Sequence, residues 1–218
     1  MAHRDLVLLD LDGTLVDSAP GILACLRHAL DALGEPAPAD EALRGFVGPP
    51  LTVTFAALGL DPARTTLAIA AYRERYHDLG LYECALYPGV RDLLAHLDAG
   101  WTLAVATSKP TYSASRIIEH FDLTHRFAFV GGADLAGTRH DKAAVIAHTL
   151  AELSDRAVRA PAHRTIMVGD REHDVRGARE HGIDTVGVLW GYGSRAELVA
   201  AGAIDLVDEP ADLLRVIG

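Results

Sequence analysis

Cysteine and long apolar runs are both scarce in this chain of 218 residues. Its two cysteines, Cys25 and Cys84, lack the spacing of metal ligands, and we expect both to be small buried side chains in a reducing compartment. No apolar stretch is long enough to span a bilayer, and the N-terminal segment is too short and too acidic for a signal peptide. We therefore expect a cytoplasmic protein, monomeric or homodimeric, that does not bind membranes.

Positive charge is also in deficit. The chain carries 20 Lys and Arg residues against 30 Asp and Glu residues, a formal net charge of −10, and no basic stretch stands out. This balance argues against a surface for a nucleic-acid polymer. It does not exclude a small anionic substrate, because a bound cation and a few local basic groups can reverse the field inside a pocket.

Lysine is the rarest basic residue. Only Lys109 and Lys142 are lysines, and the other 18 basic residues are arginines. A compact ammonium fits a crowded anion site where a planar guanidinium does not, so we expect these two lysines to have special roles. The alternative is that both are surface lysines present by chance.

The segment Asp10-Leu11-Asp12-Gly13-Thr14 follows the apolar run Leu6–Leu9, which predicts a strand buried on both faces. Acids at alternate strand positions point the same way, so their carboxylates converge. Gly13 permits a sharp turn at the end of the strand, where open α/β sheets bind ligands. A divalent cation would relieve the repulsion between the acids. The plain alternative is a solvated Asp-Gly turn.

The remaining sequence divides into two parts. Residues 18–84 contain helical signals and no strand signal, which predicts a helical cap domain inserted after the first strand. From Tyr87 onward, predicted helices alternate with predicted apolar strands. The strands are expected at residues 103–106, 127–130, 165–168, 185–189 and 204–207. Such alternation predicts a doubly wound, Rossmann-like parallel sheet with helices on both faces. The predicted core domain comprises residues 1–17 and 85–218.

Further polar residues stand at later strand ends or helix starts. Thr107 ends a predicted strand and could bind a phosphoryl oxygen or cap the following helix. Lys142 begins a helix, where its charge opposes the helix dipole unless it pairs with an anion such as Asp10. Asp170 and Asp174 lie one helical turn apart, and both also suit a helix N-terminus. Each group of residues has a plain structural explanation, but the occurrence of all four groups in this order along the chain favours a phosphate- and metal-binding site.

These motifs resemble those of the haloacid dehalogenase superfamily, whose members carry an Asp-x-Asp-Gly-Thr segment, a Thr or Ser, a Lys and a pair of acids. The matches are Asp10–Thr14, Thr107, Lys142, and Gly169-Asp170 with Asp174. Within the superfamily, the chain is similar to phosphoglycolate phosphatase-like and 5′-nucleotidase-like hydrolases with a helical cap. The loops Val47–Leu51, Thr107–Thr111 and Gly191–Ser194 carry this closer resemblance.

The resemblance implies a Mg²⁺-dependent phosphatase that hydrolyses a small phosphorylated metabolite through an aspartyl-phosphate. Asp10 would be the nucleophile, Asp12 the general acid and base, and Thr107 and Lys142 would stabilise the transferred group. Mg²⁺ would be held by Asp10, the backbone carbonyl of Asp12, Asp170 and Asp174. The implied substrate-binding residues are Gly13, Arg44, Ser108 and Lys109; Arg44 lies in a cap loop, and Lys109 could instead cap a helix.

Three other interpretations stay open at this point. A sugar-phosphate phosphomutase shares the fold, the cap and both aspartates, and release of phosphate from simple monoesters would separate the two. A receiver domain also gathers acids, a Thr and a Lys, but is about half this length and has no cap. A catalytically silent protein that binds phosphate and Mg²⁺ would show no hydrolysis of any ester.

Overall fold

The computed structural model describes residues 5–134, 138–139 and 141–217. The chain forms two compact units, Met1–Asp17 with Leu86–Gly218, and Ser18–Ala85. Short strands β2 (Val16–Asp17) and β3 (Ala85–Leu86) lie where the chain passes from one unit to the other. Each unit is described below by itself.

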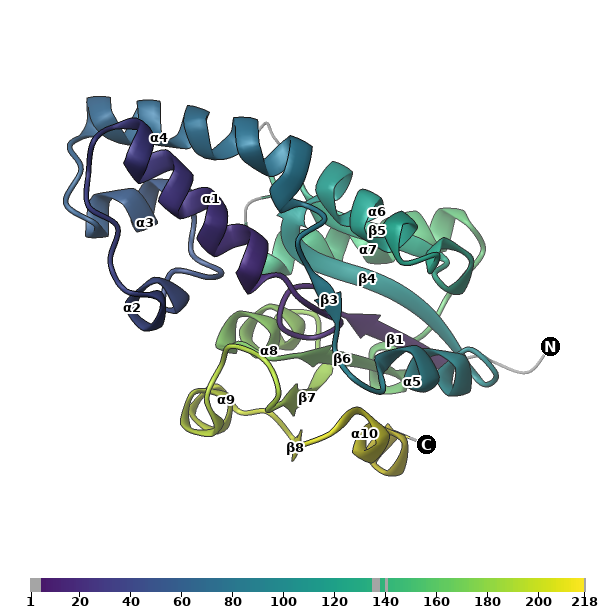
Figure 1. The fold of residues 1–218 in the computed structure, drawn as a ribbon. Coiled ribbons are helices and arrows are strands. Elements are labelled where there is room, and N and C mark those ends of the chain that lie inside the picture. The colour runs from purple at the N-terminus through teal and green to yellow at the C-terminus, as the bar shows by residue number, and fades with distance from the viewer. Residues whose placement is uncertain (1–4, 135–137, 140, 218) are drawn as a thin grey trace. The chain divides into compact units, whose positions relative to one another are not determined.

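The first unit is built on a six-stranded parallel sheet with the strand order β5-β4-β1-β6-β7-β8 (Figure 1). The strands run over Phe129–Ala133 (β5), Trp101–Pro110 (β4), Asp5–Leu9 (β1), Thr165–Gly169 (β6), Asp184–Val188 (β7) and Asp205–Val207 (β8). The doubly wound α/β fold predicted from the alternating pattern is confirmed.

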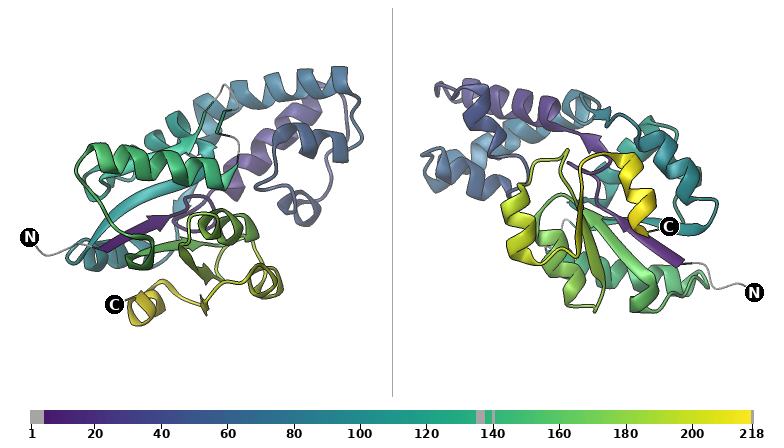
Figure 2. Two further views of the ribbon diagram at one scale, coloured as in Figure 1. Left: turned by 180° about the vertical axis from the view of Figure 1, so that it is seen from behind. Right: turned by 90° about the horizontal axis from the view of Figure 1, so that it is seen from below.

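Helices cover both faces of this sheet. They run over Val90–Leu97 (α5), Thr111–His120 (α6), Lys142–Asp155 (α7), Glu172–Arg179 (α8), Arg195–Ala201 (α9) and Pro210–Ile217 (α10). The helix α8 contacts both α7 and α9, whereas α10 contacts α5. In the left view of Figure 2, α7 lies along the face of the sheet that is turned away in Figure 1. Right-handed crossovers place α5 and α6 on the opposite face.

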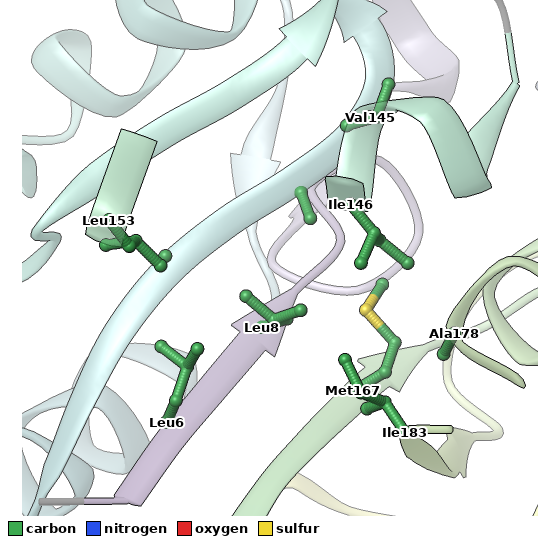
Figure 3. Packing of buried hydrophobic residues seen from close by; sticks show 10 residues of the cluster. Leu6, Leu8, Val145, Ile146, Leu153, Met167, Ala178 and Ile183 are labelled. Carbon is green, nitrogen blue, oxygen red and sulfur yellow. The ribbon is translucent and has the colours of Figure 1, made fainter. Parts of the chain in front are cut away.

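The core lies between the sheet and α7. Leu6 and Leu8 of β1 and Met167 of β6 are at most 1% exposed and pack against Ile146 of α7 (Figure 3). Val7 and Leu9 are also buried, on the other face of β1. A strand that is apolar on both faces is therefore the middle of the sheet, as expected for a parallel strand covered by helices.

Strand β4 is longer than the strand predicted over residues 103–106. It continues through Thr107 to Pro110, with an irregularity in its pairing with β5 between these two residues. A bulge of this kind adds residues to one strand and turns their side chains away from the regular alternation. The polar residues Ser108 and Lys109 hide this extension from a pattern of apolar residues.

The second unit is helical. It contains α1 (Ala19–Ala32), α2 (Asp40–Arg44), α3 (Leu51–Ala57), α4 (Pro62–Arg75) and a π-helix over Tyr76–Gly80. Both α3 and α1 pack on α4, and α1 also contacts the π-helix. Asp61 accepts a hydrogen bond from the Arg64 amide and caps α4, whereas Asp40 is the first residue of α2.

Candidate active site

Three neighbouring strands bring the predicted site residues to one edge of the sheet. Asp10 follows β1 directly, Thr107 lies in β4, and Asp170 follows β6. The amide of Asp10 donates to the Val168 carbonyl at 2.9 Å, so the ladder between β1 and β6 extends to this residue. Because parallel strands end at the same edge, local sequence patterns suffice to gather these residues.

Asp10, Asp170 and Asp174 form an acidic cluster. One carboxylate oxygen of each lies within 4.8 Å of the others, and all three residues are buried. Burial raises the pKa of Asp10 to about 6, and the negative charge of Asp174 adds to the rise while Lys142 opposes it. Burial, together with Asp174 and Asp10, raises the pKa of Asp170 to about 8. Burial and the nearby acids therefore both disfavour the ionised forms of Asp10 and Asp170.

Lys142 lies within reach of two of these acids. Its Nζ is 2.9 Å from Asp10 Oδ1 and 2.7 Å from Asp174 Oδ1, and it donates to the Ala106 carbonyl at 3.0 Å. Burial alone would lower the pKa of Lys142, but the two carboxylates raise it. The predicted contact of Lys142 with Asp10 is thus present, and the contact with Asp174 is an addition that the sequence did not indicate.

Helix geometry fixes where Lys142 lies. The Asp141 side chain accepts from the Ala144 amide and begins α7, which makes Lys142 the first helical residue. Gly177 of α8 lies against it, since a Cβ added there would be 2.8 Å from the Lys142 Cβ. The close approach of α7 and α8 therefore holds the lysine beside Asp174.

Asp174 also stabilises its own helix. Its Oδ2 accepts from the Arg171 amide at 3.0 Å at the start of α8, while Oδ1 faces Lys142. The helix-terminus role considered for this residue is therefore real, but it occupies only one of the two oxygens.

Two loops hold Asp170, one after β7 that was not predicted to be part of the site and one in the Asp10–Thr14 segment that was. Tyr192, after β7, donates its amide to Asp170 Oδ2 at 2.7 Å, and Thr14 Oγ1 lies 3.4 Å from Asp170 Oδ1. A Cβ added at Gly191 would lie 2.5 Å from the Asp170 Cβ, so this glycine allows the close approach. The Gly191-x-Gly193 spacing is the signal in the sequence that could have indicated it.

Asp12 lies apart from the acidic cluster and pairs with Lys109. Lys109 Nζ donates to Asp12 Oδ2 at 2.6 Å. The other oxygen, Asp12 Oδ1, is buried and accepts no hydrogen bond from the described residues. The Thr107 Oγ1 accepts from the Lys109 amide at 3.2 Å, two residues before α6 begins, so it does not cap that helix.

The remaining predicted residues occupy different places. Gly13, with φ +83°, lies against Asp170, and Ser108 is exposed at the bulge of β4. Arg44 is the exposed last residue of α2, in the helical unit. The structure therefore gathers Gly13 with the acids, and Arg44 stays a prediction for substrate binding.

The acidic cluster has the donor set of a divalent cation site. Asp10 Oδ1 and Asp174 Oδ1 are buried, and neither accepts a hydrogen bond of normal geometry from the residues described in the structure, although both are near Lys142. Carboxylate oxygens are the ligands preferred by hard cations such as Mg²⁺. The residues present thus fit such an ion.

Comparison with known proteins gives the family. Residues 7–188 match the model of haloacid dehalogenase-like hydrolases. The chain belongs to this family. The match includes every site residue of the first unit that was predicted from the sequence, so the fold and the motifs lead to the same family.

Three curated relatives are similar over most of the chain. The tyrosine-protein kinase PtkA of Mycobacterium tuberculosis is 45% identical over 95% of this chain and 69% of its own length. A 5′-nucleotidase of Pseudomonas aeruginosa is 42% identical over 89% of this chain and 86% of its own length. A phosphoglycolate phosphatase of Mesorhizobium japonicum is 34% identical over 88% of this chain and 86% of its own length.

A solved structure agrees with these relatives. A haloacid dehalogenase-like hydrolase from Streptococcus pneumoniae superposes with a TM-score of 0.90 at 32% identity, covering 100% of both chains. The predicted resemblance and the prediction of a phosphoric monoester hydrolase are confirmed. Among the helices of the described residues, none is both long and apolar enough to cross a membrane.

Proposed function

We propose that this hydrolase cleaves a small phosphomonoester with the help of Mg²⁺ by passing the phosphoryl group through Asp10. The observation that carries the proposal is the position of Asp10, where its buried carboxylate lies beside Lys142 and within 4.8 Å of the ligand oxygens of Asp170 and Asp174. A carboxylate held among compensating charges at a strand end can attack phosphorus without rearrangement of its surroundings.

In the first step, an oxygen of Asp10 bonds to phosphorus as the bond to the leaving oxygen breaks. Asp12 gives its proton to that leaving oxygen, so the alcohol departs neutral. The Thr107 hydroxyl and the backbone amides near Ser108 are the groups that stabilise the charge on the phosphoryl oxygens, and Lys142 holds Asp10 in place.

In the second step, water hydrolyses the aspartyl-phosphate. Asp12, now ionised, takes a proton from the water as its oxygen bonds to phosphorus and the bond to Asp10 breaks. Inorganic phosphate leaves, and both aspartates return to their starting states. Asp12 Oδ2 pairs with Lys109, whereas Oδ1 accepts no hydrogen bond from the described residues and is the oxygen available for proton transfer in both steps.

The cluster residues Asp10, Asp170 and Asp174, together with the Asp12 carbonyl, would hold the Mg²⁺ ion. When bound, the ion neutralises charge on the phosphoryl group and on the acids. Burial, to which repulsion from the neighbouring acids adds, raises the pKa values of Asp10 and Asp170, and a bound cation would stabilise their ionised forms.

The relatives suggest two substrate classes, a phosphorylated two-carbon acid and a nucleoside 5′-monophosphate. We propose that the helical unit acts as the cap that selects between them, with Arg44 as its candidate contact. Ser108 and Gly13 are the candidate contacts in the core.

A panel of phosphomonoesters tests this function by released phosphate, with Mg²⁺ and after removal of metal by EDTA. We expect hydrolysis only with Mg²⁺, and loss of turnover by at least about 10³-fold in Asp10→Asn. Asp208→Asn is the matched control, since this acid is exposed near the C-terminus and should leave turnover unchanged. Hydrolysis that persists in Asp10→Asn, or in EDTA, contradicts the proposal.

A second candidate function comes from the relative named a tyrosine-protein kinase, which is 45% identical. In that case, the acceptor is a tyrosyl hydroxyl and not water. Incubation with ATP and Mg²⁺, followed by measurement of both inorganic phosphate and phosphotyrosine, separates the two. Phosphate without phosphotyrosine supports hydrolysis, and phosphotyrosine that is lost in Asp10→Asn supports transfer.

A further inference from the structure

Lys109 of β4 and Asp12, in the turn that follows the neighbouring strand β1, form an ion pair. The distance from Lys109 Nζ to Asp12 Oδ2 is 2.6 Å, and the Lys109 side chain is only 7% exposed against 22% for Asp12. A lysine usually keeps its ammonium in water, so its burial beside one carboxylate is a specific feature of this fold.

Several features of the backbone hold Lys109 in this position. The pairing between β4 and β5 shifts between Thr107 and Pro110, which displaces Lys109 from the regular alternation of the strand. The Thr107 hydroxyl accepts from the Lys109 amide, and Gly132 of β5 lets the backbone pass closely, because a Cβ there would be 2.5 Å from the Lys109 carbonyl oxygen. The irregular pairing, the hydrogen bond and the close approach of β5 together fix the backbone at Lys109 and thus the direction of its side chain.

The ion pair gives the two carboxylate oxygens of Asp12 different surroundings. Oδ2 accepts from Lys109, whereas Oδ1 is buried and accepts no hydrogen bond from the described part of the chain. A carboxyl anchored by one oxygen can give and take a proton at the other without moving. A free Asp side chain would have to be ordered in each cycle at a cost in rotamer entropy.

We propose that Lys109 is a positioning residue that anchors Asp12 by Oδ2 and leaves Oδ1 to exchange the proton with the leaving oxygen and then with water. This inference rests on the proposed function and goes beyond it, because the roles predicted for Lys109 from the sequence were a contact with substrate or a helix cap. The two roles differ in what they predict for substrates that have no second anionic group.

Two aryl phosphates test the proposal with the Mg²⁺-loaded enzyme. The leaving group of p-nitrophenyl phosphate departs without a proton, whereas phenyl phosphate needs one, and neither has a second anionic group. The value of kcat/KM reports transfer to Asp10. For Lys109→Met we expect a loss of about 100-fold with phenyl phosphate, within the range of general acid catalysis, and of less than about 3-fold with p-nitrophenyl phosphate.

The matched control is Arg215→Met, which removes one exposed cation from the last helix and should change neither value. Lys109→Gln, which keeps a polar side chain, is the second variant if Lys109→Met does not fold by circular dichroism. An equal loss with both esters means a merely structural role and overturns the proposal. So does an unchanged rate with both esters accompanied by a raised KM only for doubly anionic substrates.

A double-mutant cycle gives an independent readout. If Lys109 acts through Asp12, then Lys109→Met should change single-turnover phenol release by less than about 2-fold once Asp12→Asn is present. Full additivity of the two losses contradicts the proposal. If the wild-type protein with Mg²⁺ cleaves neither ester, the proposed function itself has failed, which is a different result from either outcome above.

Discussion

Gly13 faces Asp170 so closely that a Cβ added to it would lie 2.3 Å from Asp170 Oδ2. Its backbone has φ +83°, a conformation that side-chain-bearing residues rarely adopt. The turn after β1 and the acid after β6 therefore fit together only if residue 13 is glycine. The glycine serves the acidic cluster as well as the turn.

Gly13→Ala should therefore both destabilise the first unit and weaken Mg²⁺ binding. The left-handed conformation costs about 1–2 kcal/mol for Ala, and displacement of Asp170 adds to this. Urea denaturation and Mg²⁺ titration measure the two effects.

The control for Gly13→Ala is Gly182→Ala. Gly182 also has positive φ (+67°), but a Cβ there meets nothing closer than 3.9 Å. This variant should show the conformational cost alone and bind Mg²⁺ normally. Equal effects of the two variants would mean that the contact with Asp170 is unimportant.

Lys142→Met should destabilise the metal-free protein by about 3–5 kcal/mol, because it leaves Asp10 and Asp174 buried without their cation. Mg²⁺ should reduce this loss, since the ion supplies positive charge to the same oxygens. Denaturation in EDTA and in excess Mg²⁺ measures the difference.

The comparison for Lys142→Met is Arg156→Met, which breaks an exposed ion pair with Glu152 in α7. Such pairs contribute about 0–1 kcal/mol. A loss in Lys142→Met as small as that in Arg156→Met would show that the buried lysine does not compensate the acids.

Glu197 should make a stabilising contribution that depends on pH. Burial favours the neutral form, but hydrogen bonds from the Glu172 amide and from Arg171 outweigh this and lower the pKa of Glu197. A lowered pKa in the folded state stabilises it above the unfolded value of about 4.3. That contribution is lost as the pH falls through the folded pKa.

Glu197→Gln should therefore reduce the free energy of unfolding at pH 7 by about 1.5–3 kcal/mol, the range for hydrogen bonds to a charged group. The difference from wild type should shrink as the pH falls below about 4. Urea denaturation over this pH range provides the measurement. A difference that is independent of pH would show that the ionised carboxylate is not what holds the start of α8.

The sequence alone was sufficient for the elements that depend on local pattern. The apolar run before Asp10, the βα alternation and the polar residues at strand ends predicted a parallel sheet with acids at one edge. The reason is physical, because parallel strands buried on both faces must be apolar throughout, and their carboxyl ends meet. The pairing of Lys142 with Asp10 was predicted separately, because a lysine at a helix start opposes the helix dipole unless it has an anionic partner.

Only the tertiary structure decided which groups form hydrogen bonds and ion pairs with the acids of the site. Asp12 pairs with Lys109 across 97 positions, and Tyr192 holds Asp170 through its backbone amide. These contacts depend on a bulge in β4 and on glycines that let loops approach the acids. Loop geometry of this kind is set by packing between distant segments, and composition and periodicity carry no record of it.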